Sequence, residues 1–281
     1  MKNNSILLKN VSCLDHRSDE IVLRKSVLID DAKIKFNSKK SYSKVIDCTD
    51  YLMIPSFVQI HTHLCQHLYK GLAEDMSLFD WLKKHILPYE SYLTKESLRL
   101  SCQMAIYELI DSGTTAILDM GTFINQDIII EEIDKSGITG FSGNILLDRK
   151  VGKWSNDLDS YIDYSRDMII QSKRSKRAKY AICPRFFPGI TKNGIKKILS
   201  LKEEFDLVLH THASETKDEN DFAEKIYKKS NIEAMGSAGM LSKKTVIAHC
   251  IHLNENDFKM LKESGSTVCH CPSSNMKLGS G

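Results

Sequence analysis

A repeated order of strand, loop and helix constrains the fold of this chain more than any other feature of its sequence. From residue 54 onward, short apolar runs alternate with segments of helical periodicity. Strands that alternate with helices form a parallel sheet with right-handed crossovers. The sequence therefore predicts the α/β class. Seven strands are expected, over residues 54–60, 115–119, 138–144, 179–183, 207–212, 245–249 and 266–270.

Helices are expected between these strands. Residues 96–112, for example, follow Thr94 and stop before Gly113, which gives suitable caps at both ends. Seven strands that are mostly followed by helices favour a (β/α)8 TIM barrel, incomplete with seven strands visible, over an open sheet. An open dinucleotide-binding sheet would need a glycine-rich loop after its first strand, where this chain has His61-Thr62-His63. Further helices are expected over residues 127–135, 158–172, 193–204, 217–229 and 255–263.

The first part of the chain has a different pattern, in which short β-prone pieces are joined by polar turns. This pattern predicts a small β module. We therefore expect two domains, the β module in residues 1–52 and the barrel in residues 53–281. Because the chain ends at Gly281, we expect the eighth barrel strand to be absent. The β-prone pieces are residues 6–11, 21–28 and 45–47, and the turns include Asp30-Asp31 and Asn37-Ser38.

Composition and charge exclude several classes of protein. With 42% hydrophobic and 27% charged residues, the chain is expected to be globular. A net charge of +3 implies no nucleic-acid partner, and the basic run at residues 173–177 is interpreted as a solvated helix end. No segment reaches the ~20 apolar residues that span a bilayer, and the N-terminus is too weakly apolar for a signal peptide. We therefore expect a cytoplasmic protein without a membrane partner. Its 8 cysteines are expected to be reduced, with Cys269 and Cys271 as small packing residues.

Histidines follow several of the predicted strands. His61 and His63 come directly after the first strand, and alternation along a strand places both imidazoles on one side. Two such imidazoles can hold zinc or iron, which activates water near neutral pH. A single His-x-His pair is common by chance, but His212, His249 and His270 also lie at the ends of apolar runs. In a (β/α)8 barrel these ends converge on one site.

The segment that follows the fifth predicted strand leaves one choice open. His210 and His212 face the same way, so periodicity does not decide which of them enters the site. Glu215 follows His212 by three residues and could act as a general acid and base, although a charge at the start of a helix is the alternative. His249 could orient the reactive water or polarise an intermediate, and a buried core histidine is the alternative.

Several short motifs, spread over nearly the whole chain, together resemble one family. The chain is similar to the amidohydrolase superfamily, in its purine and triazine aminohydrolase branch. Within the branch it most resembles deaminases of adenosine-type compounds, and also guanine deaminase. The matching motifs are His61-Thr62-His63-Leu64-Cys65-Gln66, Gly71-Leu72-Ala73-Glu74-Asp75, Asp80-Trp81-Leu82, Pro184-Arg185-Phe186, His212-Ala213-Ser214-Glu215, Ala248-His249-Cys250 and His270-Cys271-Pro272-Ser273-Ser274-Asn275.

The resemblance implies a β-sandwich portion beside the barrel and one divalent metal ion, Zn or Fe, bound by His61, His63 and His212. It makes His249 the residue beside the reactive water, in contact with substrate, and Glu215 the proton shuttle to a ring nitrogen. The expected reaction is hydrolytic deamination of a purine nucleoside-type compound. Metal-activated water attacks the ring carbon that carries the amine, and ammonia leaves. The enzyme class is a hydrolase acting on C–N bonds other than peptide bonds.

The resemblance also indicates substrate contacts. Gln66 and Arg185 match positions that guanine deaminases use to hold the base, and Trp81 would form the pocket's rim together with residues 64–87. Simple helix packing is the alternative for Trp81. The expected partner is a small purine or nucleoside, and a homodimer is compatible with the sequence. Guanine deaminase, a triazine or chloro-heterocycle hydrolase, and a non-catalytic metal- or ligand-binding fragment are the alternative functions.

The chain departs from the family pattern at three places. No aspartate follows an eighth strand, and Ser56 and Gln59 stand where glycine and aspartate are usual. Because that aspartate would bind metal and accept a proton, we expect little or no activity from this chain by itself. The fourth strand ends in Cys183-Pro184 without a lysine that could bridge two metal ions, so a single ion is expected.

Overall fold

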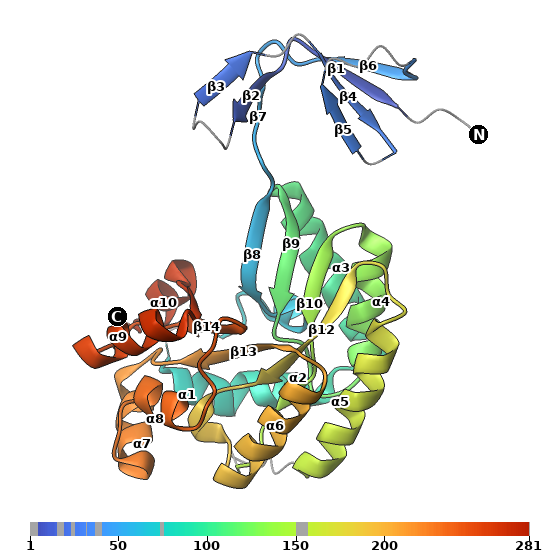
Figure 1. Ribbon diagram of the computed structural model, residues 1–281. Coiled ribbons are helices and arrows are strands. Elements are labelled where there is room, and N and C mark those ends of the chain that lie inside the picture. The colour runs from blue at the N-terminus through green and yellow to red at the C-terminus, as the bar shows by residue number, and fades with distance from the viewer. Residues whose placement is uncertain are drawn as a thin grey trace. The chain divides into compact units, whose positions relative to one another are not determined.

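The computed structural model describes residues 5–15, 20–23, 26–31, 33–36, 41–73, 76–149 and 157–280 (Figure 1). The chain forms two compact units, Met1–Ser56 and Phe57–Gly281. The division falls after Ser56, whereas the sequence analysis placed it after residue 52. The expected turn at Asn37-Ser38 lies outside the described residues.

The first unit consists of two small sheets. Val11, Cys13, Val27 and Cys48 form its buried core. The segment predicted at 21–28 is two strands that belong to different sheets, and three further strands were not predicted. One sheet has the order β5 (Lys33–Phe36), β4 (Ser26–Asp30), β1 (Ile6–Lys9), β6 (Lys44–Asp47), and the other the order β3 (Glu20–Leu23), β2 (Ser12–Asp15), β7 (Leu52–Met53).

The second unit is built on a parallel sheet of seven strands that is nearly closed and surrounded by helices. This arrangement confirms the predicted incomplete (β/α)8 barrel. The first strand begins at Phe57, two residues after Pro55, because proline has no N–H for a strand ladder. In order across the sheet, the strands are β15 (Thr267–Cys269), β14 (Thr245–His249), β13 (Val208–Ala213), β12 (Ala178–Pro184), β10 (Thr139–Ser142), β9 (Thr114–Asp119) and β8 (Phe57–Thr62), while β11 (Ile145–Leu146) pairs with β12.

The predicted helices all occur, with ends that differ by at most two residues. The helix expected at 217–229 stops at Tyr227 because Lys228 takes a left-handed conformation, and Ser230 then caps a new helix. Helices between β8 and β9 were also missed, so residues 64–87 are largely helical. The helices are η1 (Leu64–Tyr69), α1 (Leu78–Trp81), η2 (Leu82–Ile86), α2 (Leu87–Tyr92), α3 (Lys95–Asp111), α4 (Gln126–Ser136), α5 (Leu158–Ser172), η3 (Phe187–Gly189), α6 (Lys192–Glu204), α7 (Lys217–Tyr227), α8 (Asn231–Ser237), α9 (Glu255–Ser264) and α10 (Pro272–Leu278).

The main core lies between the parallel sheet and its covering helices. Ile129 and Ile133 of α4 are fully buried in the same cluster as Ile182, Leu209 and Ile247 of the strands. Each such side chain stabilises the fold by about 1.5–3 kcal/mol. This core fixes the strands, and therefore the positions of the side chains at their carboxyl ends.

Two glycines allow the backbone to pack closely at those carboxyl ends. A Cβ atom on Gly121 would lie 1.8 Å from the carbonyl oxygen of Gly143, and one on Gly143 would lie 1.7 Å from that of Ala181. The φ of Gly121 is +76, a left-handed conformation that favours glycine. The segments after β9 and β10 can therefore lie close to each other and to β12.

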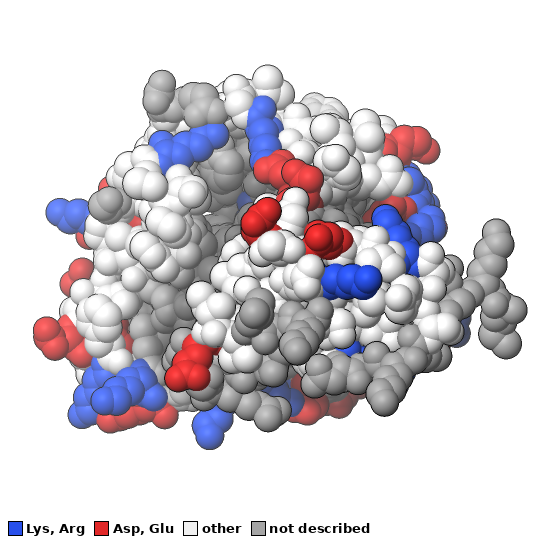
Figure 2. Space-filling view, turned by 90° about the horizontal axis from the view of Figure 1, so that it is seen from above, with Lys and Arg blue, Asp and Glu red and all other residues white. Residues whose placement is uncertain are grey.

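The described surface carries both signs of charge. On the face that Figure 2 shows, acidic and basic side chains are interspersed, as expected for a net charge of +3. Among the described residues, no helix has the length and hydropathy that crossing a membrane requires.

Candidate active site

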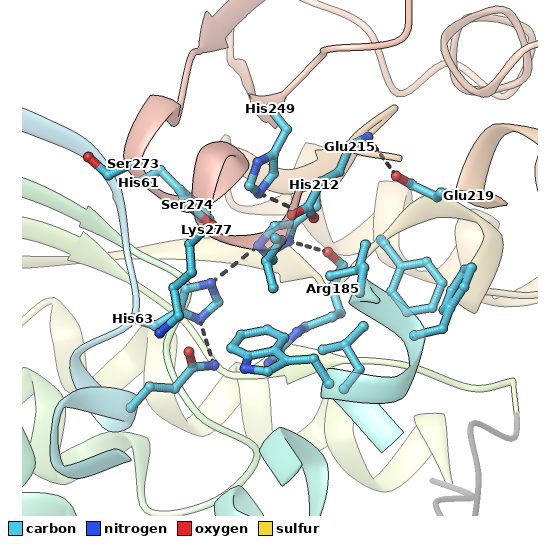
Figure 3. Close-up of a pocket in the computed structure, with 17 residues that line it drawn as sticks. His61, His63, Arg185, His212, Glu215, Glu219, His249, Ser273, Ser274 and Lys277 are labelled. Atoms are coloured by element: carbon cyan, nitrogen blue, oxygen red, sulfur yellow. Dashed lines mark hydrogen bonds and ion pairs between the residues drawn. The ribbon is translucent and has the colours of Figure 1, made fainter. Parts of the chain in front are cut away.

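Three of the predicted histidines meet at the carboxyl ends of the strands (Figure 3). His61 belongs to β8, His63 follows it directly, and His212 comes from β13. The Nε2 atoms of His63 and His212 are 3.2 Å apart, and one ring nitrogen from each of the three histidines lies within 4.8 Å of the others. These are the three residues that the sequence analysis selected as metal ligands.

The protonation of these imidazoles suits a metal ion. His212 places Nδ1 2.6 Å from the backbone oxygen of Arg185. Because a carbonyl oxygen only accepts, Nδ1 carries the proton and Nε2 presents its lone pair to the site. Burial lowers the pKa of His61, His63 and His212 well below the usual value. They are therefore neutral near pH 7, which is the form that binds zinc or iron.

The structure resolves the choice between His210 and His212. His210 is fully buried behind the site, with Nε2 2.9 Å from Nδ1 of His61. This contact occupies Nδ1 of His61 and leaves Nε2 to face the cavity. Burial also lowers the pKa of His210 to about 3, so it is a neutral partner. Such outer partners fix the orientation of a metal-binding imidazole.

Glu215 and His249 lie next to each other at the ends of β13 and β14. Oε2 of Glu215 is 3.4 Å from Nε2 of His249. Burial, together with the negative charge of Glu219, raises the pKa of Glu215 to about 8. Glu215 is therefore protonated near neutral pH, and it can donate that proton.

His249 is held by its backbone and by a neighbouring amide. Burial lowers its pKa to about 4, so its ring is neutral. Oδ1 of Asn275 lies 3.2 Å from Nδ1 and can only accept, so Nδ1 carries the proton and Nε2 faces Glu215. The φ of His249 is +75, a conformation that costs about 1–3 kcal/mol for a non-glycine residue. The surrounding contacts therefore hold this histidine in a strained position.

A cavity of about 320 Å³ opens onto these residues (Figure 3). One wall is mostly apolar, and Trp81 is part of it. Trp81 also packs against the cluster formed by Leu78, Leu82 and Ile86, so the rim and the packing interpretations both describe its environment. The lining residues are His61, His63, Gln66, Leu78, Phe79, Trp81, Leu82, Arg185, Phe186, His212, Glu215, Glu219, His249, Ser273, Ser274, Lys277 and Leu278.

A buried carboxylate connects the two residues expected to hold a base. Nη1 of Arg185 lies 3.0 Å from both carboxylate oxygens of Glu90, and Nε2 of Gln66 lies 2.7 Å from Oε1. Glu90 is 1% exposed and Arg185 is 3% exposed. The sequence analysis missed Glu90. Its signal was a charged residue at the end of the apolar run Ile86-Leu87-Pro88-Tyr89.

Comparison with known proteins assigns the chain to a family. Residues 52–281 match the model of the amidohydrolase family. The chain belongs to this family. It is 32% identical over 272 residues to a protein of Pyrococcus horikoshii named 5-methylthioadenosine/S-adenosylhomocysteine deaminase. The aligned region covers 92% of this chain and 61% of that relative. A Nitratidesulfovibrio vulgaris protein of the same name is 33% identical over 237 residues, and this alignment covers 84% of this chain and 53% of that relative. This chain thus spans between about half and two thirds of the length of these relatives.

Solved structures resemble this amidohydrolase over nearly its whole length. Guanine deaminase from C. acetobutylicum, with bound guanine, superposes with a TM-score of 0.87 at 25% identity. The superposed region covers 99% of this chain and 70% of the guanine deaminase chain. The E. coli guanine deaminase gives 0.84 at 28% identity, with 99% and 69% covered. An adenosine deaminase from Xanthomonas campestris with bound zinc gives 0.88 at 21% identity, with 99% and 65% covered. That last similarity supports the fold alone.

One expected histidine does not reach the site of this amidohydrolase. His270 is exposed and is absent from the cavity wall, so the expectation that all five strand-end histidines converge is wrong. The strand β15 ends at Cys269, so His270 lies beyond the strand and is not directed by its alternation. Cys271, which was interpreted as a packing residue, has its sulfur within 4.8 Å of ring nitrogens of His61 and His249.

Proposed function

We propose that this chain carries the catalytic site of a metal-dependent deaminase that hydrolyses the C–N bond of an adenosine-like purine compound. The observation that carries this proposal is the convergence of three neutral imidazoles on one point beside the protonated carboxyl group of Glu215. The names of the related proteins support the same reaction and a purine substrate.

In this proposal His61, His63 and His212 hold one zinc or iron ion. The bound ion would supply Lewis acidity and lower the pKa of water to near 7. The ligand set fits such an ion because all three imidazoles are neutral and the Nε2 atoms of His63 and His212 lie 3.2 Å apart. The buried partner His210 keeps His61 in the required orientation.

Glu215 and His249 move and direct the protons. With its pKa raised to about 8, Glu215 can give its proton to the ring nitrogen next to the carbon under attack, which prevents negative charge from developing there. It then accepts a proton from the attacking water and delivers it to the departing amine. His249, neutral and fixed by Asn275, holds the water in line with that carbon.

The cavity accounts for the substrate class. Gln66 and Arg185 offer hydrogen bonds at one side, and the apolar wall with Trp81 and Phe186 offers a surface for a purine ring and an apolar substituent. A methylthio group, as in the compound named for the relatives, would suit this wall. We therefore place 5′-methylthioadenosine first among the candidate substrates.

Guanine is a second candidate, favoured by the hydrogen-bonded set of Gln66, Glu90 and Arg185. A buried carboxylate that orients an amide and a guanidinium makes a rigid polar surface for a base with its own donors and acceptors. The structural similarity to guanine deaminases points in the same direction.

An assay of ammonia release tests the proposal. The metal-loaded chain is incubated with 5′-methylthioadenosine, S-adenosylhomocysteine, adenosine and guanine, beside the variants Glu215→Gln and His212→Ala. We expect release from a purine substrate that either variant abolishes. One bound metal ion per chain without release from any of these compounds would instead favour a non-catalytic ligand-binding fragment.

A further inference from the structure

We propose that His61, His249 and Cys271 form a second metal position, which contains sulfur and binds soft ions such as Cd²⁺. It lies next to the all-imidazole position of the proposed deaminase and shares His61 with it. Neither the family match nor the names of the relatives assign such a position.

The geometry brings the three donor atoms to one place. One ring nitrogen of each histidine and the sulfur of Cys271 all lie within 4.8 Å of one another. They come from three separate strand ends, since His61 lies in β8, His249 ends β14 and Cys271 follows β15. Both histidines are more than nine-tenths buried, and Cys271 is partly exposed. An ion could therefore enter from the side of the thiol.

The hydrogen bonds of these residues leave the required lone pairs available. Nδ1 of His61 contacts His210, and Nδ1 of His249 contacts Oδ1 of Asn275, so both residues direct Nε2 away from those partners. Nε2 of His249 lies 3.4 Å from Oε2 of Glu215, and an ion at this position would replace that contact. The sulfur of Cys271 lies 3.4 Å from the backbone oxygen of Cys269 and 4.0 Å from the sulfur of Cys269, and it also accepts a hydrogen bond from the backbone of His249. When a metal–sulfur bond forms, the thiol proton leaves to solvent, and no other bond is broken.

The two metal positions exclude each other. Each needs Nε2 of His61, and one imidazole nitrogen donates its lone pair to one ion only. Ligand softness then decides which position fills, because a thiolate prefers soft ions whereas imidazoles suit zinc and iron. A soft ion at the sulfur-containing position therefore removes His61 from the position that His63 and His212 complete.

Binding of Cd²⁺ to the whole chain tests this proposal by spectroscopy. A thiolate bound to Cd²⁺ gives a charge-transfer absorption in the ultraviolet. We expect this absorption in the natural chain, in Cys269→Ser as the matched control, and in His212→Ala, which lacks one imidazole of the other position. We expect Cys271→Ser to lose it and to bind Cd²⁺ at least tenfold more weakly.

Two results would overturn the proposal. One is an absorption of full size in Cys271→Ser, and the other is its loss in Cys269→Ser. The ¹¹³Cd resonance of the natural chain gives a reading that depends on no variant, because its chemical shift separates a site with one sulfur from a site with nitrogen and oxygen alone. A shift without a sulfur contribution also rejects the proposal. These readings do not depend on turnover, so a failed deaminase assay leaves them intact.

Discussion

The Nε2 atoms of His63 and His212 lie 3.2 Å apart, although 149 positions separate the two residues in the sequence. Two neutral imidazoles that direct nitrogens at each other need a shared proton or a cation between them. Because His61 adds a third nitrogen to the same point, a metal ion is the better match to this arrangement.

Removal of His212 should abolish tight metal binding. We expect His212→Ala to lower zinc affinity by more than the ~10–100-fold typical of losing an outer-shell partner, because a direct ligand is lost. Metal content after dialysis against a weak chelator measures the effect. His270→Ala is the matched control, since His270 is an exposed strand-end histidine. Equal metal content in the two variants would contradict the assignment of His212.

The buried partner His210 should matter for metal affinity without being a ligand. In His210→Phe the hydrogen bond to Nδ1 of His61 is lost while the volume remains filled. We expect zinc affinity to fall by about 10–100-fold, and His210→Gln to recover part of the loss. Competition with a coloured chelator gives the affinities, and circular dichroism checks the fold. Unchanged affinity in the phenylalanine variant would show that His210 only packs.

Most of the barrel could be predicted from the sequence because its strands contain short apolar runs and several helices, such as α3, α6 and α9, begin at a side-chain cap. The helices α1 and α2 could not, since Pro88 and the short apolar runs there carry no clear helical period. The strand β5 also escaped prediction, because its four residues are all exposed and lack a buried face.

The site was partly predictable for the same reason. The position of His61 and His63 at the end of a strand could be predicted from spacing, whereas the choice of His212 over His210 came from the family resemblance. The ion pair between Glu90 and Arg185 could not be predicted, because the two residues are 95 positions apart. No pattern in the sequence indicates that the helix α2 packs against the end of β12. The inward direction of Cys271 depended on where β15 ends, which local sequence does not fix.

The raised pKa of Glu215 should make the metal-free chain less stable as the pH rises. The pKa of Glu215 in the folded chain is about 8, against an ordinary value of 4.5 for a glutamate. Between these values the folded chain keeps a proton that the unfolded chain has lost, so stability falls with rising pH, by up to about 1.4 kcal/mol per pH unit. Below pH 4.5 this group has no effect on stability.

Glu215→Gln removes this titration. We therefore expect the variant to be more stable than the natural metal-free chain at pH 8, and the difference to shrink toward pH 5. Urea unfolding at several pH values measures it. Glu224→Gln, on the exposed side of α7, serves as the control and should follow the natural chain. A difference that grows toward acid pH would contradict the assigned direction of the shift.

The ion pair between Glu90 and Arg185 should be a stability determinant as well as a support for the cavity. Both side chains are almost completely buried, and their contacts are 3.0 Å. Glu90→Gln keeps the shape but leaves the guanidinium charge without its partner, which typically costs about 3–5 kcal/mol. Replacing both residues, Glu90→Gln with Arg185→Met, removes the uncompensated charge. We therefore expect the double variant to be more stable than Glu90→Gln alone, as measured by urea unfolding. If the two substitutions destabilise additively, the residues are not coupled and Glu90 does not hold Arg185 in place.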